Sequence, residues 1–224
     1  MSRPVTLSHG ALALLVDDTA EGRGVFDEVV ARDCYGLRAL KDAGEEVGVA
    51  WDLGASWGLA SAVIASLWPG AEVHAFEPHP GRYALAAKNL ASFPGVRLYN
   101  AGLVGSLGDP VRILDGVAYD GVWRKSPLEA FGEDVRANLV SAREFTPRGV
   151  IDLMKIDVEG FEAGILRDMK NAGALPRVRR IRGEWHFNAL VDLPRILRDT
   201  HDVEMRLPMD RNPWGAFEAV LRVP

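Results

Sequence analysis

Cysteine is nearly absent from this sequence: the 224 residues include only Cys34. A single cysteine excludes a disulfide framework within the chain and fits a reducing compartment. We expect Cys34 to be a small buried residue rather than a nucleophile. Long apolar runs are also lacking, because the longest one near the N-terminus is Ala11–Val16. Such a run is too short for a membrane span or the core of a signal peptide, so we expect a cytoplasmic protein with no membrane partner.

An excess of positive charge is lacking as well. Lys and Arg total 26 against 31 Asp and Glu, which gives a net charge of −5. A chain of that sign is not built to neutralise phosphates, so we expect no nucleic-acid partner. The hydrophobic content of 48% and the charged content of 25% are those of an ordinary globular protein. The length predicts one decorated domain that needs no disulfide or structural metal for its stability.

The dinucleotide-binding pattern G-x-G-x-x-G is missing from the stretch where it is expected, residues 47–58 (VGVAWDLGASWG). This stretch reads as a buried strand, a glycine turn and the start of a helix, with Asp52 at the strand end and glycines at 54 and 58. An acid there repels a pyrophosphate, which binds helix N-terminal N–H groups. It suits a ligand with a positive amino group, such as S-adenosylmethionine. A generic strand–turn–helix corner is the alternative.

The second strand, 71–78 (AEVHAFEP), also ends in an acid, Glu77. Glu77 follows Gly54 at roughly the 20-residue distance typical of a ribose-binding carboxylate. Both NAD and S-adenosylmethionine sites use such an acid, and a solvated acid at a strand end is the structural alternative. Pro78 keeps the chain extended after it. A third strand over 96–103 places Asn100 near its end, where a polar side chain can flank an adenine ring.

Two later strands repeat the pattern. A buried strand over 151–156 ends at Asp157, and a fifth strand over 178–187 ends in Glu184, Trp185 and His186. Strands over 203–208 and 216–223 are too close in sequence for a helical crossover, so we predict an antiparallel hairpin. The whole predicts an α/β fold, a doubly wound sheet with one antiparallel strand. Ligands of such sheets bind beyond the carboxyl ends of the strands, where these acids gather.

Two regions depart from strand–helix alternation. Residues 1–46 form an N-terminal segment with a predicted short strand at Ala11–Val16 and a predicted helix at Val25–Ala43. We expect this segment to act as a helical cap or lid. Residues 104–126 are predicted to form turns and short strands, and 127–145 a helix. We therefore divide the chain into a cap, 1–46, and a main domain, 47–224, with an irregular insertion around 104–150.

The segments VAWDLGASWGLAS, HAFEPHPGRYALAAKNL and IDLMKIDVEGFEAGIL, followed by RGEWH, resemble the FkbM-type S-adenosylmethionine-dependent methyltransferases of the class I superfamily. The resemblance covers about residues 47–188 and implies a seven-stranded Rossmann-like fold. It also implies methyl transfer, usually to a hydroxyl oxygen of a small natural product or a sugar. Trp57 and residues 104–150 depart from the family pattern. By the resemblance the cofactor would be bound by Asp52, Gly54, Ala55, Gly58, Glu77, Pro78, Asn100 and Asp157.

Transfer to a hydroxyl needs a group that removes the proton. Asp157, Glu184 and His186 are the candidates, and we hypothesise that His186 is the base, oriented by Glu184 or Asp157. The alternative is that His186 caps a strand while the carboxylates anchor loops. A divalent cation bound by Asp157, Glu159 and Glu184 is a second hypothesis, although the spacing does not require a metal. Two other functions stay open: an NAD-dependent oxidoreductase, and a catalytically silent methyltransferase-like binding module.

Overall fold

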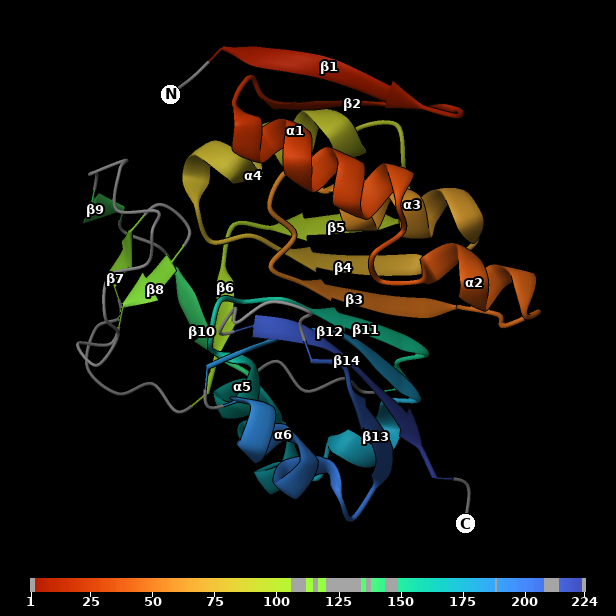
Figure 1. Cartoon of the computed structure of the whole chain (residues 1–224), viewed down its shortest axis with the longest axis vertical. Helices are drawn as coiled ribbons and strands as arrows, with labels where there is room; N and C mark the ends of the chain where they lie inside the picture. Colours follow the sequence, from red (N-terminus) through yellow and green to blue (C-terminus); the bar gives the residue numbers. More distant parts are fainter. Residues whose placement is uncertain are drawn as a thin grey trace.

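A seven-stranded sheet forms the centre of the protein (Figure 1). The computed structural model describes residues 3–105, 112–114, 117–119, 134–135, 138–143, 149–187, 189–207 and 214–222. The strand order is β13–β14–β12–β11–β3–β4–β5, and only β14 runs against its neighbours. In that order the strands span His201–Met205, Trp214–Leu221, Arg180–His186, Leu153–Ile156, Val49–Leu53, Glu72–Phe76 and Val96–Tyr99. The predicted doubly wound sheet with an antiparallel strand from a C-terminal hairpin is confirmed.

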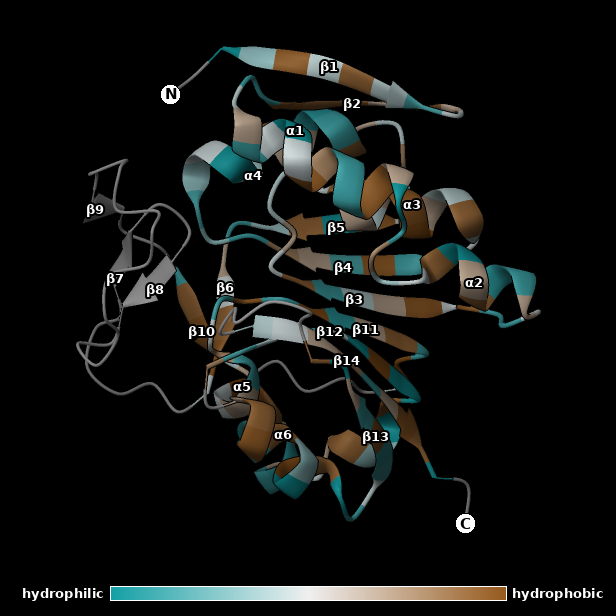
Figure 2. Ribbon diagram, viewed as in Figure 1, coloured by the Kyte–Doolittle hydropathy of each residue, from teal (hydrophilic) through white to brown (hydrophobic). Residues whose placement is uncertain are grey.

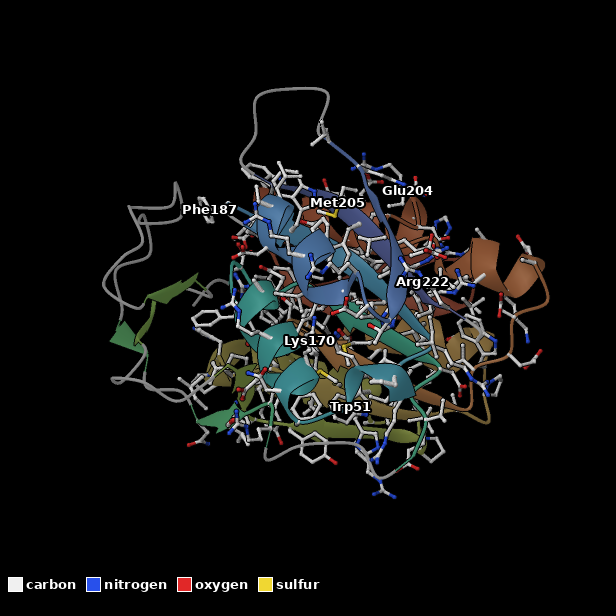
Figure 3. The ribbon with its side chains drawn as sticks, turned by 90° about the horizontal axis from the view of Figure 1, so that it is seen from below. Trp51, Lys170, Phe187, Glu204, Met205 and Arg222 are labelled. Carbon is white, nitrogen blue, oxygen red and sulfur yellow. The ribbon has the colours of Figure 1, made fainter. Side chains whose placement is uncertain are left out.

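Helices cover both faces of the sheet. In Figure 1, α1 (Ala20–Phe26), α3 (Leu59–Leu67) and α4 (Pro80–Leu90) lie on one side, and α5 (Glu162–Asn171) and α6 (Ala189–Leu197) lie on the other. Figure 2 shows apolar residues gathered on α3 and hydrophilic ones on α4. Lys170 of α5 donates to the Ile196 carbonyl at 3.0 Å and to Asp199 at 2.7 Å, which joins the C-terminal ends of α5 and α6 (Figure 3).

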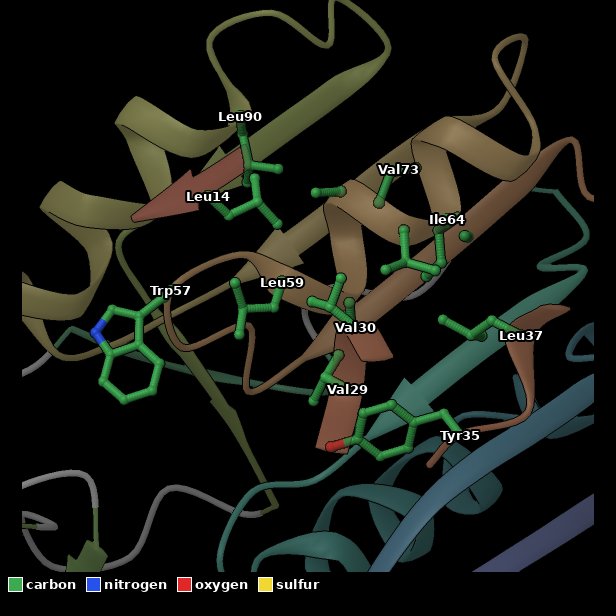
Figure 4. Packing of buried hydrophobic residues seen from close by; sticks show 14 of the residues in the cluster. Leu14, Val29, Val30, Tyr35, Leu37, Trp57, Leu59, Ile64, Val73 and Leu90 are labelled. Atoms are coloured by element: carbon green, nitrogen blue, oxygen red, sulfur yellow. The ribbon is translucent and has the colours of Figure 1, made fainter. Parts of the chain in front are cut away.

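Side chains along each strand point alternately to the two faces of the sheet, so the core consists of two clusters. Ala50 and Leu153 belong to the cluster under α3, whereas their neighbours Trp51 and Met154 belong to the cluster under α5 and α6. Figure 4 shows the first cluster, where Ile64 and Leu59 of α3 meet side chains from the N-terminal segment. Strands β3, β4 and β11 are largely buried and mostly apolar, and two acids, Glu77 and Asp157, come directly after β4 and β11. That pattern is why the chemistry of the chain collects at one edge of the sheet.

The N-terminal segment is less helical than predicted. It starts with an antiparallel hairpin of β1 (Pro4–His9) and β2 (Leu12–Asp17), of which only the second strand was expected. The single helix predicted at Val25–Ala43 is wrong: the helical stretch ends with a π-helical turn, η1 (Asp27–Ala31), and α2 (Leu37–Asp42) is separate. Asp33 lies between them at a φ of 55°. Its carboxylate accepts the Leu37 and Arg38 N–H groups, so a new helix begins there.

The segment after β5 leaves the main sheet. β6 (Gly102–Val104) pairs in parallel with β10 (Leu139–Ser141), and β7 (Arg112–Leu114), β8 (Val117–Tyr119) and β9 (Asp134–Val135) form a small antiparallel sheet. The helix predicted over 127–145 is wrong where the structure describes this segment, because β9 and β10 are strands. The rest of that prediction lies outside the described residues.

Two further features bear on the expectations from sequence. Cys34 is an exposed residue, so the expectation that it is buried is wrong. Desolvation by the groups crowded around its thiol, together with the Glu184 charge, raises the pKa of Cys34 to about 12, so the thiol stays protonated. Across the described residues, every helix is too short or too polar to span a bilayer.

Candidate functional site

A cavity of about 150 Å³ lies beyond the carboxyl ends of β3, β4 and β11. Acids directly follow β4 and β11, as the sequence predicts, whereas Asp52 is the last but one residue of β3. Glu77 lies on one part of the wall, and Asp157 and Glu159 lie on another. The other residues that line it are Glu21, Val25, Gly54, Ser56, Trp57, Pro78, Arg82, Gly102, Leu103, Val104, Leu139, Val158 and Phe161.

The turn between β3 and α3 needs its two glycines. Gly54 has a φ of 79°, and a Cβ there would lie 1.9 Å from the Asp157 carbonyl oxygen. Gly58 has a φ of 78° just before α3, and its Cβ would lie 2.9 Å from Leu90. The N–H groups of Gly54 and Ala55 donate to the Phe76 carbonyl at 3.1 and 2.9 Å. The turn is therefore held against β4 with bare backbone at the cavity wall, where a ligand can approach closely.

Glu77 is a buried carboxylate that organises the cavity wall. One oxygen accepts the Ser56 N–H at 2.7 Å, and the other accepts the His79 N–H at 2.7 Å. Burial raises the pKa of Glu77 to about 7, although Arg82 and the two N–H groups act in the opposite sense. Each carboxylate oxygen has a second lone pair, so Glu77 can still accept the two hydroxyls of a ribose.

Asp52 does not line the cavity, contrary to the expected direct contact with the cofactor. Its carboxylate is fully buried, accepts the Ser61 hydroxyl at 2.6 Å and lies 3.3 Å from the Lys155 ammonium. Lys155 also donates to the Gly54 carbonyl at 2.6 Å. The acid at the end of β3 therefore holds a lysine that in turn holds the glycine turn. Asp52 therefore acts on the cavity through Lys155 and the Gly54 carbonyl.

Asn100 likewise supports the wall instead of lining it. Its amide donates to the Glu77 and Pro78 carbonyls at 3.0 and 3.3 Å. Pro78 itself lines the cavity, beside Gly102 and Leu103 of β6. The side of the cavity where adenine is expected is therefore lined by apolar side chains and backbone. Asn100 supports this wall through its hydrogen bonds to the Glu77 and Pro78 carbonyls.

The third group of predicted residues forms one acidic cluster, defined here as Asp157, Glu159, Glu184 and His186. Asp157 and Glu159 line the cavity, whereas Glu184 and His186 do not. The His186 Nε2 atom is 3.5 Å from a Glu159 oxygen and 3.9 Å from a Glu184 oxygen. Asp157 also accepts the Tyr35 hydroxyl at 2.7 Å. The structure thus brings together all the residues proposed for catalysis and for the optional cation.

The charged groups of this acidic cluster shift one another's pKa values. Desolvation by the surrounding groups raises the pKa of Glu184 to about 8 and that of the partly exposed Glu159 to about 7, and the Asp157 charge adds to both shifts. Burial lowers the pKa of His186, but its hydrogen bond to Glu162 and the surrounding acids outweigh burial and raise it to about 9. At neutral pH His186 therefore carries its proton. That argues against the hypothesis that it is the free base of the reaction.

Sequence reasoning missed four contributors to this site. Lys155 and Glu162 lie inside the motif IDLMKIDVEGFE, so their position next to Asp157 was a usable signal. Tyr35 and Arg82 come from the N-terminal segment and from α4, and no spacing links them to the cavity. Arg82 lies 5.3 Å from the Trp57 ring centre and pairs with Glu21 of α1 at 3.0 Å, so the N-terminal segment closes one side of the cavity.

Comparison with known proteins adds to this geometry. Residues 42–208 match the sequence profile of the methyltransferase FkbM domain. The methyltransferase sdnD of Sordaria araneosa is 29% identical over 198 residues, which cover 73% of this chain and 75% of that protein. The hexuronic acid methyltransferase AglP of Haloferax volcanii is 29% identical over 140 residues. These cover 61% of this chain and 56% of AglP, so the chain spans little more than half of that relative.

Solved structures show the same fold at low identity. The N-methyltransferase NodS from Bradyrhizobium japonicum, in complex with S-adenosyl-L-homocysteine, has a TM-score of 0.55 at 8% identity, covering 91% of this chain and 93% of that one. An S-adenosylmethionine-dependent methyltransferase from Agrobacterium tumefaciens has a TM-score of 0.53 at 15% identity, covering 99% of this chain and 71% of that one. Similarity at this level concerns the architecture of the sheet and its helices.

Proposed function

Because the chain belongs to the family of FkbM methyltransferase domains, we propose that it transfers the methyl group of S-adenosylmethionine to a hydroxyl oxygen of a small acceptor. The acceptor is a sugar or a hydroxylated natural product. One observation carries this proposal: a single cavity has the buried carboxylate of Glu77 on one part of its wall and the carboxylates of Asp157 and Glu159 on another. The first suits the ribose of the cofactor, and the second suits an acceptor that must lose a proton.

The residues present fit the cofactor. Gly54, Ser56 and Trp57 of the Gly54–Gly58 turn line the cavity, and Gly54 offers backbone without a side chain to the methionine part; Ala55 and Gly58 lie in the same turn but do not line the cavity. Glu77 has lone pairs left for both ribose hydroxyls, and Pro78 and Leu103 supply an apolar surface for the adenine ring. Asp52 contributes through Lys155 and the Gly54 carbonyl rather than by contact.

The chemistry asks two things of the protein. S-adenosylmethionine supplies an electrophilic methyl group: the C–S bond breaks with its electron pair going to sulfur, and an oxygen lone pair forms the new C–O bond. The cavity has to hold the acceptor oxygen in line with that bond, since orientation alone can contribute about 7–11 kcal/mol. A carboxylate of the acidic cluster then takes the hydroxyl proton. General-base assistance of this kind is typically worth about 10²–10⁴ in rate.

Several observations support a small, hydroxylated acceptor. Both curated relatives are named as methyltransferases, and one of them acts on a hexuronic acid. The net charge of −5 and the acids that line the cavity disfavour a nucleic-acid substrate. The same charge pattern and the short apolar runs agree with a cytoplasmic site of action. An NAD-dependent oxidoreductase is disfavoured by the missing G-x-G-x-x-G pattern, and a silent binding module by the intact acids.

Methyl-tritiated S-adenosylmethionine tests the proposal. The purified protein is incubated with a panel of neutral sugars, hexuronic acids and hydroxylated aromatic or polyketide compounds. We expect tritium in an acceptor, and we expect it to survive mild alkaline hydrolysis, because an ether methyl is stable and a carboxylate ester releases methanol. NADH oxidation with the same panel, measured at its absorbance maximum, tests the oxidoreductase alternative.

Glu77→Gln and Glu72→Gln provide matched variants for this assay. Both lie on or just after β4 and lose the same charge, but Glu72 is at the opposite end of the strand, where it pairs with Arg97 at 3.3 Å. Methyl transfer should fall at least tenfold in Glu77→Gln and stay near normal in Glu72→Gln. Alkali-labile label would instead assign carboxyl methylation, and label on amines alone would reject the hydroxyl acceptor.

A further inference from the structure

The side chain of His186 is held with one ring nitrogen facing the acids. It is 6% exposed, and its Nδ1 atom is 2.8 Å from a Glu162 oxygen. Nε2 makes no hydrogen bond to any residue that the structure describes, and its nearest carboxylate oxygens, of Glu159 and Glu184, are 3.5 and 3.9 Å away. A buried ring nitrogen aimed at carboxylates beyond ordinary hydrogen-bond distance leaves room between them for another group.

The dimensions of that space suit a metal ion. One carboxylate oxygen of Asp157, one of Glu159 and a ring nitrogen of His186 all lie within 4.8 Å of one another. Ligands on opposite sides of an octahedral Mg²⁺ are about 4.2 Å apart, since each lies about 2.1 Å from the ion. Adjacent octahedral ligands are only about 3.0 Å apart, so the three atoms have to draw closer together to bind the ion. Asp157 and Glu159 line the cavity, so the remaining coordination positions would face it.

The surroundings of the histidine are those of a metal ligand. Ligating histidines almost always donate their second N–H to a carboxylate or carbonyl, which sets the tautomer and the ring orientation. Glu162 is fully buried and provides this carboxylate. The same Glu162 oxygen accepts the Val158 and Gly160 N–H groups at 3.2 and 3.1 Å, so the turn that carries Glu159 is fixed by the residue that orients His186.

We propose that Asp157, Glu159 and His186 bind one octahedral divalent cation of the Mg²⁺ or Mn²⁺ type. The mixed carboxylate and imidazole set favours Mn²⁺ over Ca²⁺, which prefers oxygen ligands throughout. This ligand set differs from the one hypothesised from sequence, because His186 takes the place of Glu184.

The role of the cation rests on the proposed methyl transfer. A cation at this position would hold the acceptor hydroxyl and lower its pKa. The oxygen keeps its electron pair for the new bond to carbon, and the proton passes to a carboxylate oxygen of Asp157 or Glu159 that does not bind the ion, since both side chains line the cavity. The cation also offsets the repulsion between the acids, so an acceptor that carries a carboxylate of its own could enter.

Binding of Mn²⁺ alone tests the site without any assay of activity. The protein is first treated with a chelator and desalted, then titrated with Mn²⁺ by calorimetry and by the loss of the free-ion signal in electron paramagnetic resonance. We expect one Mn²⁺ per chain, displaced by excess Mg²⁺, and release of the proton that His186 carries in the metal-free protein as the ion binds. In Glu159→Gln and His186→Gln the dissociation constant should rise at least tenfold. Glu21→Gln is the matched control, because Glu21 lines the same cavity but lies outside the acidic cluster.

Circular dichroism and thermal melting check that each variant is folded; Glu159 is the safer position because its side chain is 42% exposed. Wild-type protein that takes up no Mn²⁺, or Glu159→Gln that binds it as tightly as Glu21→Gln, would overturn the proposal. A parallel titration with S-adenosylhomocysteine in chelator separates the two ideas. If the nucleoside binds and Mn²⁺ does not, the cation site fails and the proposed function stands.

Discussion

Replacing Lys155 with methionine should destabilise the protein by about 3–5 kcal/mol, the usual cost of removing one partner of a buried ion pair. Lys155 and Asp52 have side chains that are 3% and 0% exposed, and their charged atoms are 3.3 Å apart. Without the ammonium, the Asp52 carboxylate keeps the Ser61 hydroxyl as its one partner among the described residues, while the Gly54 carbonyl loses its 2.6 Å donor. Methionine retains the length of the stem, so lost packing contributes little.

Urea unfolding measures this loss. With a slope of about 2 kcal/mol per molar urea, the midpoint should fall by about 1.5–2.5 M. The double variant Lys155→Met with Asp52→Asn removes both charges and should recover more than half of the loss, because no buried charge is left alone. Lys41→Met removes an exposed lysine that pairs with Glu46 at 2.9 Å, and should change stability by less than about 0.5 kcal/mol. The reasoning is refuted if Lys155→Met behaves like Lys41→Met, or if the double variant is no more stable than the single one.

Three further predictions concern the cavity wall. Burial raises the pKa of Glu77 to about 7, so its carboxyl group is deprotonated mainly above neutral pH. Calorimetry should therefore show that the affinity for S-adenosylhomocysteine rises about tenfold from about pH 6 to about pH 8, and that Glu77→Gln shows no such rise. Gly54→Ala would place a Cβ 1.9 Å from the Asp157 carbonyl oxygen, at a residue whose φ is 79°. Thermal melting should therefore show that the protein loses at least about 2 kcal/mol of stability, and binding of S-adenosylhomocysteine should disappear. Normal binding would contradict the role of the turn. Asn89→Leu removes the side-chain partner of three backbone groups, the buried Trp57 carbonyl and the partly buried N–H and carbonyl of Leu15. We expect a loss of about 2–4 kcal/mol in urea unfolding, and a loss below about 1 kcal/mol would reject this link between the hairpin and the cavity.

The sheet was predictable because its central strands obey a simple rule. Strands buried on both faces are short apolar runs, and β3, β4 and β11 are each followed directly by an acid or by a glycine turn. The close spacing of the last two strands left no room for a crossover, so the hairpin of β13 and β14 could be predicted without any fold analogy. Helices α3 to α6 followed from the same alternation.

The irregular parts were not predictable for a physical reason. Asp33 ends one helical stretch and begins another through two hydrogen bonds of its own side chain, a local event that apolar periodicity does not report. Val140 of β10 and Ala142 just after it pack against the second core, and the Ser141 hydroxyl donates to Asp168 at 2.8 Å, so tertiary contacts decide the structure of this strand. The sequence of residues 139–141 is compatible with a helix, but this segment forms a strand because it pairs with β6.

For the site, sequence predicted which residues gather but not what each one faces. Asp52 and Asn100 are at the expected strand ends, yet both side chains turn away from the cavity toward Lys155 and the backbone. His186 was expected to be a free base because isolated histidine titrates near neutrality. Glu162 changes that environment, and no spacing in the sequence shows that the two residues meet.

Calorimetry with S-adenosylhomocysteine at about pH 8 tests the central claim that this cavity binds an adenosyl cofactor through Glu77. We predict one molecule bound per chain by the wild type and by Glu72→Gln. Binding by Glu77→Gln should be about 30-fold weaker, equivalent to about 2 kcal/mol for one charge-assisted hydrogen bond. A wild-type protein that does not bind the nucleoside, or a Glu77→Gln variant that binds it as tightly as Glu72→Gln, would contradict the claim.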